Sequence, residues 1–168
     1  MKEKKSMKVK EIMSANAKVC TPTSSLAEAA GLMWENDCGI VPVVTEGEKV
    51  VGLITDRDIC MAACTQGRNL SNIAIEEITS GKVFACKAED DIHVALKTMR
   101  ENKVHRLPVV DANGKLEGIL SMNDIVLKAQ EASGKKPPEL SYAEVVNTYK
   151  SICEHRLPMQ QAQAATAV

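Results

Sequence analysis

Gly52-Leu53-Ile54-Thr55-Asp56-Arg57-Asp58 is the stretch that decides the fold, because it returns 66 residues later as Gly118-Ile119-Leu120-Ser121-Met122-Asn123-Asp124. Sliding the chain over itself by this offset aligns residues 9–59 with residues 75–125 without a gap, and 15 of the 51 pairs are identical. Two copies are too few for a solenoid. We therefore expect two similar units that pack around a pseudo-two-fold axis.

Each copy predicts the same order of elements: a short strand, a helix, two strands and a second helix. Ser25 and Glu28 have the spacing of a capping box ahead of an apolar stripe at helical spacing, and Asp90 or Asp91 caps the equivalent helix of the second copy. The second helices begin near Asp56 and Asn123, and each pair of later strands is joined by a short turn that contains glycine. The expected strands are residues 19–21, 40–44 and 50–54 in the first copy and residues 84–86, 107–110 and 116–120 in the second.

The ends of the chain differ from the repeats. Lysines at positions 2, 4, 5, 8 and 10 form a basic arm, which we expect to be a solvated tail. Beyond a linker with the sequence Lys135-Lys136-Pro137-Pro138, an amphipathic helix is expected to dock by a face that carries Tyr142, Val145, Tyr149 and Ile152. The expected organisation is a basic arm (1–8), repeat 1 (9–68), repeat 2 (69–133), a linker (134–140), a C-terminal helix (141–157) and a disordered tail (158–168).

The amino-acid composition argues against several classes of function. Lys and Arg number 21 against 22 Asp and Glu, which argues against a nucleic-acid binder with a broad basic face. Aromatic residues make up 2% of the chain, too few for a base-stacking platform. The sequence has no membrane-length apolar run and no secretory signal, so we expect a cytoplasmic protein with reduced cysteines and no membrane contact. It also has no C-x-x-C motif and no histidine cluster, so no metal site is expected.

The repeated motif offers a site for a nucleotide. Thr55 and Ser121 each stand where a strand delivers a hydroxyl to the start of a helix, which suits a phosphate. Asp58 and Asp124 follow three residues later, and a carboxylate can accept two hydrogen bonds from vicinal ribose hydroxyls. The same spacing is also a plain capping box that needs no ligand, and the motif taken alone favours capping.

The two copies resemble a tandem pair of cystathionine-β-synthase-type (CBS) domains of the stand-alone prokaryotic signalling kind, over residues 9–132. The resemblance rests on the repeat length, on Pro42-Val43-Val44 and its copy, and on Thr55-Asp56-Arg57-Asp58-Ile59. It implies an α/β fold of two β-α-β-β-α repeats packed as a pseudo-two-fold pair, with the C-terminal helix added. It further implies a regulatory signal-transduction module that binds AMP, ADP or ATP as its ligand.

Other functions stay open beside this one. A sensor of NAD(H) or S-adenosylmethionine would read the same adenosine group, and a ligand-free dimerisation module would use the motifs only as caps. An enzyme is not expected, because no histidine, cysteine or serine sits in a recognisable nucleophile motif and the motifs contain no general base.

The resemblance also implies residue roles. Asp58 and Asp124 would hold the ribose hydroxyls, while Thr55 and Ser121 would meet the α-phosphate. Backbone segments would line the two adenine slots and short stretches would form the opposing walls. The slots would comprise Val19, Cys20 and Thr21 in one copy and Ala85, Cys86 and Lys87 in the other; the walls would comprise Gly39, Ile40 and Pro42, and His105, Arg106 and Pro108.

The two copies differ in the basic residues that could bind a phosphate. His105 and Arg106 resemble a phosphate-facing His-Arg stretch, and Arg can fork two donors onto a phosphate. The first copy has Gly39 and Ile40 at these positions, so its cation would come from Arg57, from a helix end or from the other repeat.

The resemblance implies a homodimer as well. Trp34 lies on the flank of the first helix, where the second copy has Arg100, and a single Trp in an aromatic-poor protein is a candidate interface anchor. Because the chain shows no effector domain, we expect its output to pass through assembly or through an unidentified target protein.

Overall fold

A computed structural model describes residues 6–132 and 137–154 of the chain. Lys2, Lys4 and Lys5 of the basic arm lie outside these ranges, as do Lys135 and Lys136 of the linker and the segment 155–168 that was expected to end the last helix and form a disordered tail.

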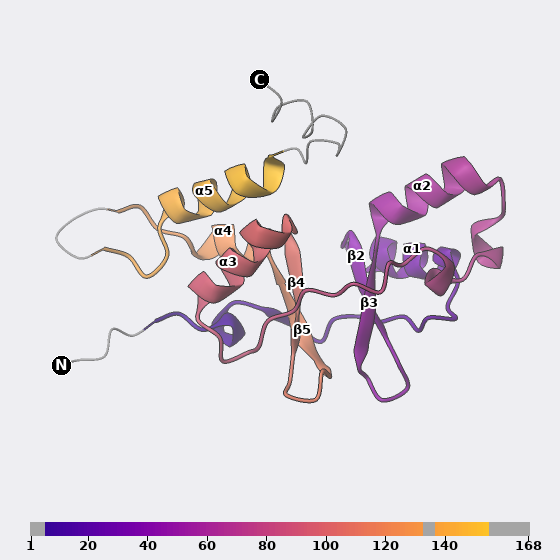
Figure 1. Cartoon of the computed structure of the whole chain (residues 1–168), viewed down its shortest axis with the longest axis horizontal. Helices are drawn as coiled ribbons and strands as arrows, with labels where there is room; N and C mark the ends of the chain where they lie inside the picture. The colour runs from indigo at the N-terminus through magenta and orange to yellow at the C-terminus, as the bar shows by residue number, and fades with distance from the viewer. Residues whose placement is uncertain (1–5, 133–136, 155–168) are drawn as a thin grey trace, which may run out of the picture.

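Two units of the same design make up the structure (Figure 1). They confirm the expected α/β class. In each unit a helix leads into an antiparallel hairpin, and a second helix follows directly from the hairpin. The first repeat contains α1 (Leu26–Glu35), β2 (Ile40–Val44), β3 (Val50–Thr55) and α2 (Asp56–Gln66), and the second contains α3 (Ile92–Asn102), β4 (Arg106–Val110), β5 (Leu116–Ser121) and α4 (Met122–Lys128).

The short strand expected before each first helix is reduced to a single bridge. Cys20 pairs in parallel with Val43, and Cys86 pairs in the same way with Val109. Beyond this bridge the chain makes local contacts: the Lys87 amide, for example, donates to Asp90 at 2.8 Å. The chain thus turns toward the helix instead of continuing as a strand.

Side-chain caps begin the helices. Ser25 and Glu28 form the predicted capping box of α1. Asp91, and not Asp90, caps α3, where it accepts a hydrogen bond from the His93 amide at 2.8 Å. An N-cap of this type contributes about 1 kcal/mol to stability, so the local sequence defines where these helices start.

The two hairpins meet at their tips through reciprocal contacts. The Val50 amide donates to the Gly114 carbonyl, and the Leu116 amide donates to the Glu48 carbonyl, both at 3.1 Å. Residues 50 and 116, and residues 48 and 114, are equivalent under the 66-residue offset. The pair of bonds therefore reports the expected pseudo-two-fold relation directly. Glu48 and Gly114 also share a left-handed backbone, with φ of 60° and 83°.

The segment that begins each repeat packs on the other repeat. The 3-10 helix η1 (Val9–Glu11) places Val9 in the core of the second repeat, and β1 (Ser14–Ala15) pairs antiparallel with β5. In the same way Ile73 and Ile75, around the 3-10 helices η2 (Leu70–Asn72) and η3 (Ile75–Glu77), complete the core of the first repeat. Two separate apolar cores result, each closed by a segment distant in sequence.

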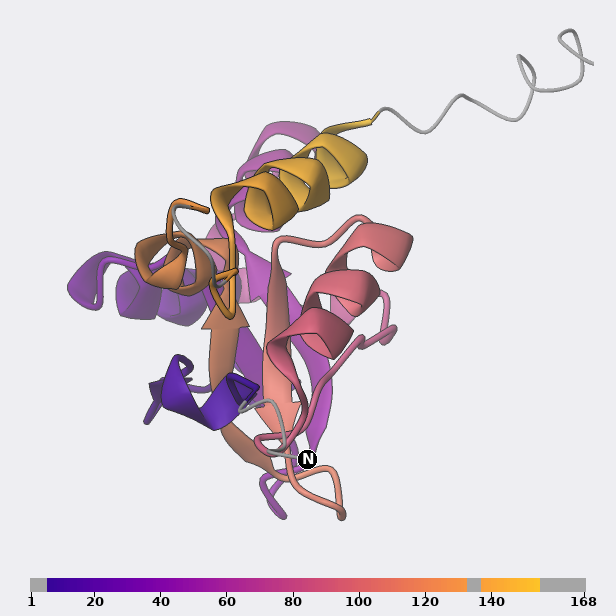
Figure 2. The same ribbon diagram turned by 90° about the vertical axis from the view of Figure 1, so that its left-hand side faces the viewer.

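The C-terminal helix α5 (Tyr142–Cys153) covers the helical face of the second repeat, over α3 and α4 (Figures 1 and 2). Val145, Thr148 and Ile152 are buried there. Tyr142, expected on the packing face, is instead 55% exposed at the first turn. Thr148 can take an inward position because its hydroxyl donates to the Glu144 carbonyl within the helix, at 2.9 Å.

Candidate functional site

A cavity of about 410 Å³ lies at the start of α4, where the N-terminal segment passes the second repeat; we call it the Asp124 cavity. Asp124 and Ser121 form one wall. The loop before β2 and the segment around β1 form others, and Arg106 enters from β4. The lining consists of Ser14, Ala15, Asn16, Ala17, Lys18, Asn36, Asp37, Cys38, Gly39, Ile40, Arg106, Ile119, Ser121, Asn123 and Asp124.

The two oxygens of Asp124 have different surroundings. Oδ2 accepts hydrogen bonds from the Ser121 amide at 2.8 Å and from the Ser121 hydroxyl at 2.6 Å. From the described part of the chain, Oδ1 accepts one long bond, from the Ser14 hydroxyl at 3.5 Å. One oxygen therefore caps α4, while the other faces the cavity with capacity for further donors. Capping and ligand binding are compatible at this residue.

Asp58 has the same cap but a different setting. Its Oδ2 accepts from the Thr55 amide at 3.1 Å and from the Thr55 hydroxyl at 2.6 Å. The equivalent cavity, here called the Phe84 cavity, measures about 340 Å³, and neither Thr55 nor Asp58 lines it. All seven of its lining residues are 66-residue counterparts of residues in the Asp124 cavity: Leu53, Ser80, Lys82, Phe84, Asn102, Lys103 and Val104.

Phe84 explains part of this difference. It stands at the position of Lys18 in the other copy, and its partly buried ring packs against the core of the second repeat. Lys82 lies over the ring with its Nζ 5.0 Å from the centroid. An aromatic ring and a cation thus occupy the region where the Asp124 cavity has two hydrophilic side chains, Asn16 and Lys18.

Arg106 and His105 point to different places. Arg106 lines the Asp124 cavity, and its Nη2 would lie 3.6 Å from a Cβ placed on Gly39 of the first repeat. The His105 ring lies instead beside Tyr149 of α5, with ring centroids 6.0 Å apart. Successive side chains of extended backbone point to opposite sides. The structure therefore brings Arg106, but not His105, to the cavity.

The remaining predicted residues divide between the lining of the Asp124 cavity and other positions. Gly39 and Ile40 do line the Asp124 cavity. Pro42 and Pro108 are buried within their strands, where their carbonyls accept from the Cys20 and Cys86 amides. Exposed positions are occupied by Val19, Thr21, Arg57, Ala85 and Lys87.

Cys20 and Cys86 are packing residues. Burial raises the pKa of both thiols, that of Cys86 to about 12. A thiol is reactive as the thiolate, so these two groups stay protonated and unreactive near neutral pH.

Sequence reasoning missed the walls that come from distant segments. The side chains around β1 reach the cavity only because β1 pairs with β5 of the other repeat. The available sequence signal lay in the residue types of Asn16 and Asp37, because Asn and Asp tolerate a left-handed backbone better than most residues. Both have such a backbone here, with φ of 59° and 47°. The missed lining residues are Ser14, Ala15, Asn16, Ala17, Lys18, Asn36, Asp37, Cys38, Ile119 and Asn123.

Two features are absent from the described ranges 6–132 and 137–154. No group of three or more His, Cys, Asp or Glu side chains there could hold a metal ion. None of the helices in those ranges combines the length and the apolar character needed to cross a membrane.

Comparison with known proteins adds family evidence. The model of the CBS domain matches residues 9–64 and 75–131. An uncharacterized protein of Methanopyrus kandleri, MK0525, is 34% identical over 122 residues, which is 73% of this chain and 62% of that protein. This chain thus spans less than two thirds of that relative.

Two solved structures are similar and contain ligands. The CBS domain pair of protein MJ0100, in complex with 5'-methylthioadenosine and S-adenosyl-L-methionine, has 30% identity and a TM-score of 0.66 over 73% of this chain and 95% of that one. CBSX2 in complex with AMP has 26% identity and a TM-score of 0.63 over 71% of this chain and 93% of that one.

Proposed function

Because the chain belongs to the CBS domain family, we propose that it is a regulatory module that binds an adenine nucleotide in the Asp124 cavity. The observation that carries the proposal is that Asp124, whose Oδ2 but not Oδ1 forms the helix cap, lines a cavity of about 410 Å³ together with Ser121 and Arg106. A carboxylate oxygen suits ribose hydroxyls, and a guanidinium suits a phosphate.

The proposed ligands are AMP, ADP and ATP. Arg106 and Lys18 place two cations on the cavity lining, which favours a phosphate over an uncharged adenosine tail. The relatives CBSX2 and MJ0100 bind AMP and S-adenosyl-L-methionine with methylthioadenosine, respectively. S-adenosylmethionine or NAD(H) is therefore the alternative ligand class. The proposed module does not turn its ligand over.

The two repeats are proposed to bind unequally. Asp124 lines a cavity, whereas Asp58 does not line the Phe84 cavity. Binding is therefore assigned first to the second repeat, with the Thr55 and Asp58 pair acting as a helix cap.

Calorimetry with Asp124→Ala and Asp58→Ala tests this assignment. Both variants lose an equivalent cap, so their unfolding free energies should fall by similar amounts, about 1 kcal/mol. Asp124→Ala should in addition weaken AMP binding roughly ten- to a hundredfold, because a lost hydrogen bond to a charged group costs about 1.5–3 kcal/mol. Asp58→Ala should leave AMP affinity nearly unchanged.

A ligand panel of AMP, ADP, ATP, NADH and S-adenosylmethionine separates the alternatives. Binding of S-adenosylmethionine or NADH in preference to every adenine nucleotide would favour the alternative sensor. Binding of none of them would leave both motifs as caps and would favour a structural dimerisation module.

We also propose that the module works in the cytoplasm as a homodimer that signals to a target protein. All six cysteines are free, which suits a reducing compartment. Trp34 is 89% exposed, which suits contact with another chain. Sedimentation tests the homodimer: a monomer at every protein concentration would contradict it, whereas an unchanged dimer in Trp34→Ala would contradict only the anchor role of Trp34.

A further inference from the structure

One histidine joins two helices at the point where both begin. The His93 ring, in the first turn of α3, lies between two carboxylates, and we call this arrangement the His93 bridge. Its Nδ1 is 2.7 Å from Asp91 Oδ1, and its Nε2 is 3.1 Å from Glu144 Oε1 in the first turn of α5. Asp91 is the N-cap of α3, and Glu144 belongs to the capping box of α5. The bridge therefore ties the start of α5 to the start of α3.

Both carboxylates are held in place by other groups as well. Asp91 accepts hydrogen bonds from the His93 amide, at 2.8 Å, and from the Ser6 hydroxyl. Glu144 Oε2 accepts from the Ser141 amide at 2.8 Å and from the Ser141 hydroxyl at 2.7 Å. Burial opposes ionisation of both groups, but the hydrogen bonds and the His93 ring outweigh it, so the pKa of Asp91 is lowered to about 2 and that of Glu144 is also lowered. Two positioned anions thus face one ring at neutral pH.

The protonation state of the ring decides whether it can serve both anions. An imidazolium has two N–H donors, whereas a neutral imidazole has one donor and one lone pair. Either neutral tautomer leaves one of the two carboxylates facing a nitrogen lone pair. The bridge is therefore complete only when the ring is charged, and histidine is the side chain that changes charge between about pH 5 and about pH 8.

The other charged groups on the elements that meet here have partners of their own. Lys8 of the N-terminal segment meets Asp91 through a backbone bridge. Ion pairs join Lys97 to Glu101 within α3, and Lys10 of the N-terminal segment to Glu89 of the loop before α3. Within residues 6–132 and 137–154, His93 is the ion-pair partner of both Asp91 and Glu144. A change in the charge of this ring therefore acts on both carboxylates directly.

At its other end α5 has a polar attachment of a different kind. Lys103 Nζ donates to the Glu154 carbonyl at 2.8 Å, and a lysine keeps its charge between about pH 5 and about pH 8. Between the two ends α5 packs by apolar side chains, and the His105 ring lies beside Tyr149 with the ring centroids 6.0 Å apart. The start of α5 is thus the end whose attachment includes a histidine between carboxylates.

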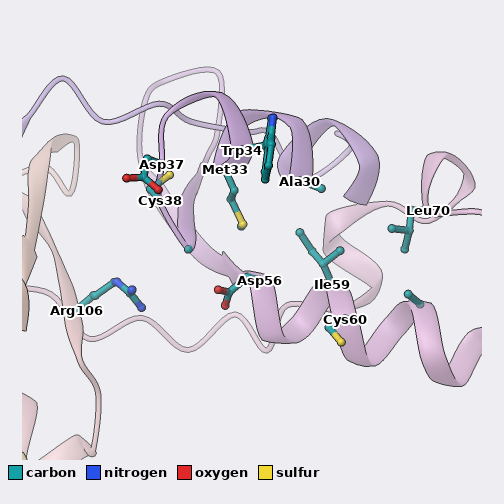
Figure 3. A pocket seen from close by; sticks show the side chains of 12 residues that line it. Ala30, Met33, Trp34, Asp37, Cys38, Asp56, Ile59, Cys60, Leu70 and Arg106 are labelled. Atoms are coloured by element: carbon teal, nitrogen blue, oxygen red, sulfur yellow. The ribbon is translucent and has the colours of Figure 1, made fainter.

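The first repeat has neither the histidine nor the helix. Ala27 stands at the position of His93, and Ser25 stands at that of Asp91. Within the described ranges no further helix covers this repeat, and an open groove of about 760 Å³ lies between α1 and α2, with Trp34 of the proposed homodimer contact at its edge (Figure 3). The bridging histidine therefore belongs to the repeat that has a helix to hold.

We propose that the His93 bridge is a pH-dependent link that holds the start of α5 on the second repeat. The protonated ring donates to both carboxylates, and loss of the proton leaves one donor for two anions. The contact to Asp91 is the shorter one, so the neutral ring keeps its donor there and the bond to Glu144 is lost. Attachment of the first turn of α5 is thus linked to uptake of a proton, and it is stronger near pH 5.5 than near pH 8. The pH then sets how often this end of the helical face of the second repeat is uncovered.

Amide hydrogen exchange of the full chain tests this link, and because no nucleotide is added, the result is independent of the proposed function. Protection factors compare each amide with its intrinsic exchange rate at the same pH. At residues 145–147 they should fall roughly two- to fivefold between about pH 5.5 and about pH 8, the range expected for a half-exposed ion pair. His93→Ala, which copies the first repeat, should give the lower protection at both pH values.

Two further variants separate the proposed link from a general loosening of α5. Glu144→Gln should remove the pH dependence while it keeps the helix cap, because Gln also serves in a capping box. Lys103→Asn removes the attachment at the other end of α5, and Asn tolerates the left-handed backbone of this position, where φ is 53°. Lys103→Asn should lower protection at residues 151–153 equally at both pH values and should keep the pH dependence at residues 145–147.

Three results would overturn the proposal. They are protection at residues 145–147 that is equal at the two pH values in the parent, protection that is higher near pH 8, and a pH dependence that survives in His93→Ala. In the last case, loss of the pH dependence in His105→Ala would assign it instead to the ring that lies beside Tyr149.

Discussion

The two repeats share a backbone plan but differ in what covers them. The helical face of the second repeat is closed by α5, and its motif opens into the Asp124 cavity. Within residues 6–132 and 137–154 no further helix covers the helical face of the first repeat, and its motif serves as a helix cap outside the cavity that Phe84 lines. The comparison shows how two copies of one backbone unit can differ in their surroundings: the second has a covered helical face and a cavity lined by its motif, and the first has neither among the described residues.

The largest expected effect comes from truncating the same core position in each repeat. Ile125 is fully buried in the cluster that includes Ile152, whereas Ile59 borders the open groove with 7% exposure. Ile125→Ala should lower the free energy of unfolding by about 3–4 kcal/mol, because α5 encloses the cavity it leaves. Ile59→Ala should cost about 2 kcal/mol, because solvent can enter the space. Denaturant unfolding measures both.

Equal losses of unfolding free energy in the two variants would contradict this difference between the repeats. They would mean that α5 does not close the second repeat in solution. In a variant that ends at Gly134 and so has no α5, Ile125→Ala should lower the free energy of unfolding by less than it does in the full chain. That result would support the role of α5 in enclosing the core of the second repeat.

A second pair of matched changes tests the exchanged N-terminal segment. A Cβ on Gly118 would lie 2.6 Å from the Ser14 carbonyl oxygen, whereas a Cβ on Gly52 would lie 3.5 Å from its nearest neighbour, Thr79. Gly118→Ala should therefore displace β1 and cost about 1–3 kcal/mol, as overpacking does, and Gly52→Ala should cost under about 0.5 kcal/mol. Thermal unfolding measures the difference.

The same pair has a second readout in ligand binding. Because Ser14 lines the Asp124 cavity, Gly118→Ala should also weaken AMP binding, and Gly52→Ala should not. An unchanged AMP affinity in Gly118→Ala would remove the N-terminal segment from the proposed site.

Features set by neighbouring residues were predictable from the sequence, and features set by distant pairing were not. The Ser25 cap and the existence of the two hairpins follow from short-range spacing and from the turn residues between the strands. The pairing of β1 with β5 and the packing of α5 on α3 depend on contacts between segments that are distant in the sequence, which no local pattern encodes. For this reason the Asp124 and Ser121 wall was anticipated, while the wall around β1 was missed.

His105 shows a further limit. The His-Arg pair is contiguous in sequence, but extended backbone sends its two side chains to different sides, one to α5 and one to the cavity. A motif that is read as a unit can therefore divide between two surfaces. Which of the two side chains meets a ligand depends on what covers each side, and that is a tertiary property.

The smallest expected effect is a pH dependence at the cap of the first helix of the second repeat, α3. Burial alone would raise the pKa of Asp91, but hydrogen bonds from Ser6 and from the His93 amide and ring, with the charge of that ring, lower it to about 2. Burial would also raise the pKa of Glu144, but hydrogen bonds from Ser141 and from His93, with the charge of the His93 ring, lower it. The first repeat has Ser25, which does not titrate in this range, where the second has Asp91.

The sign of the effect follows from the direction of these shifts. A carboxyl group whose pKa is depressed by folding contributes stability while it is ionised, so the contribution of Asp91 is present above about pH 4 and is lost as the pH falls toward about 2. Asp91→Ser, which copies the cap of the first repeat, should therefore lower the melting temperature slightly near neutral pH and flatten its fall between about pH 5 and about pH 2. Asp90→Ser, one residue away, is the control and should keep the steeper fall of the parent. A melting temperature that falls equally steeply in Asp91→Ser and in the parent would show that the acid sensitivity arises elsewhere and that the two first helices are equivalent in this respect.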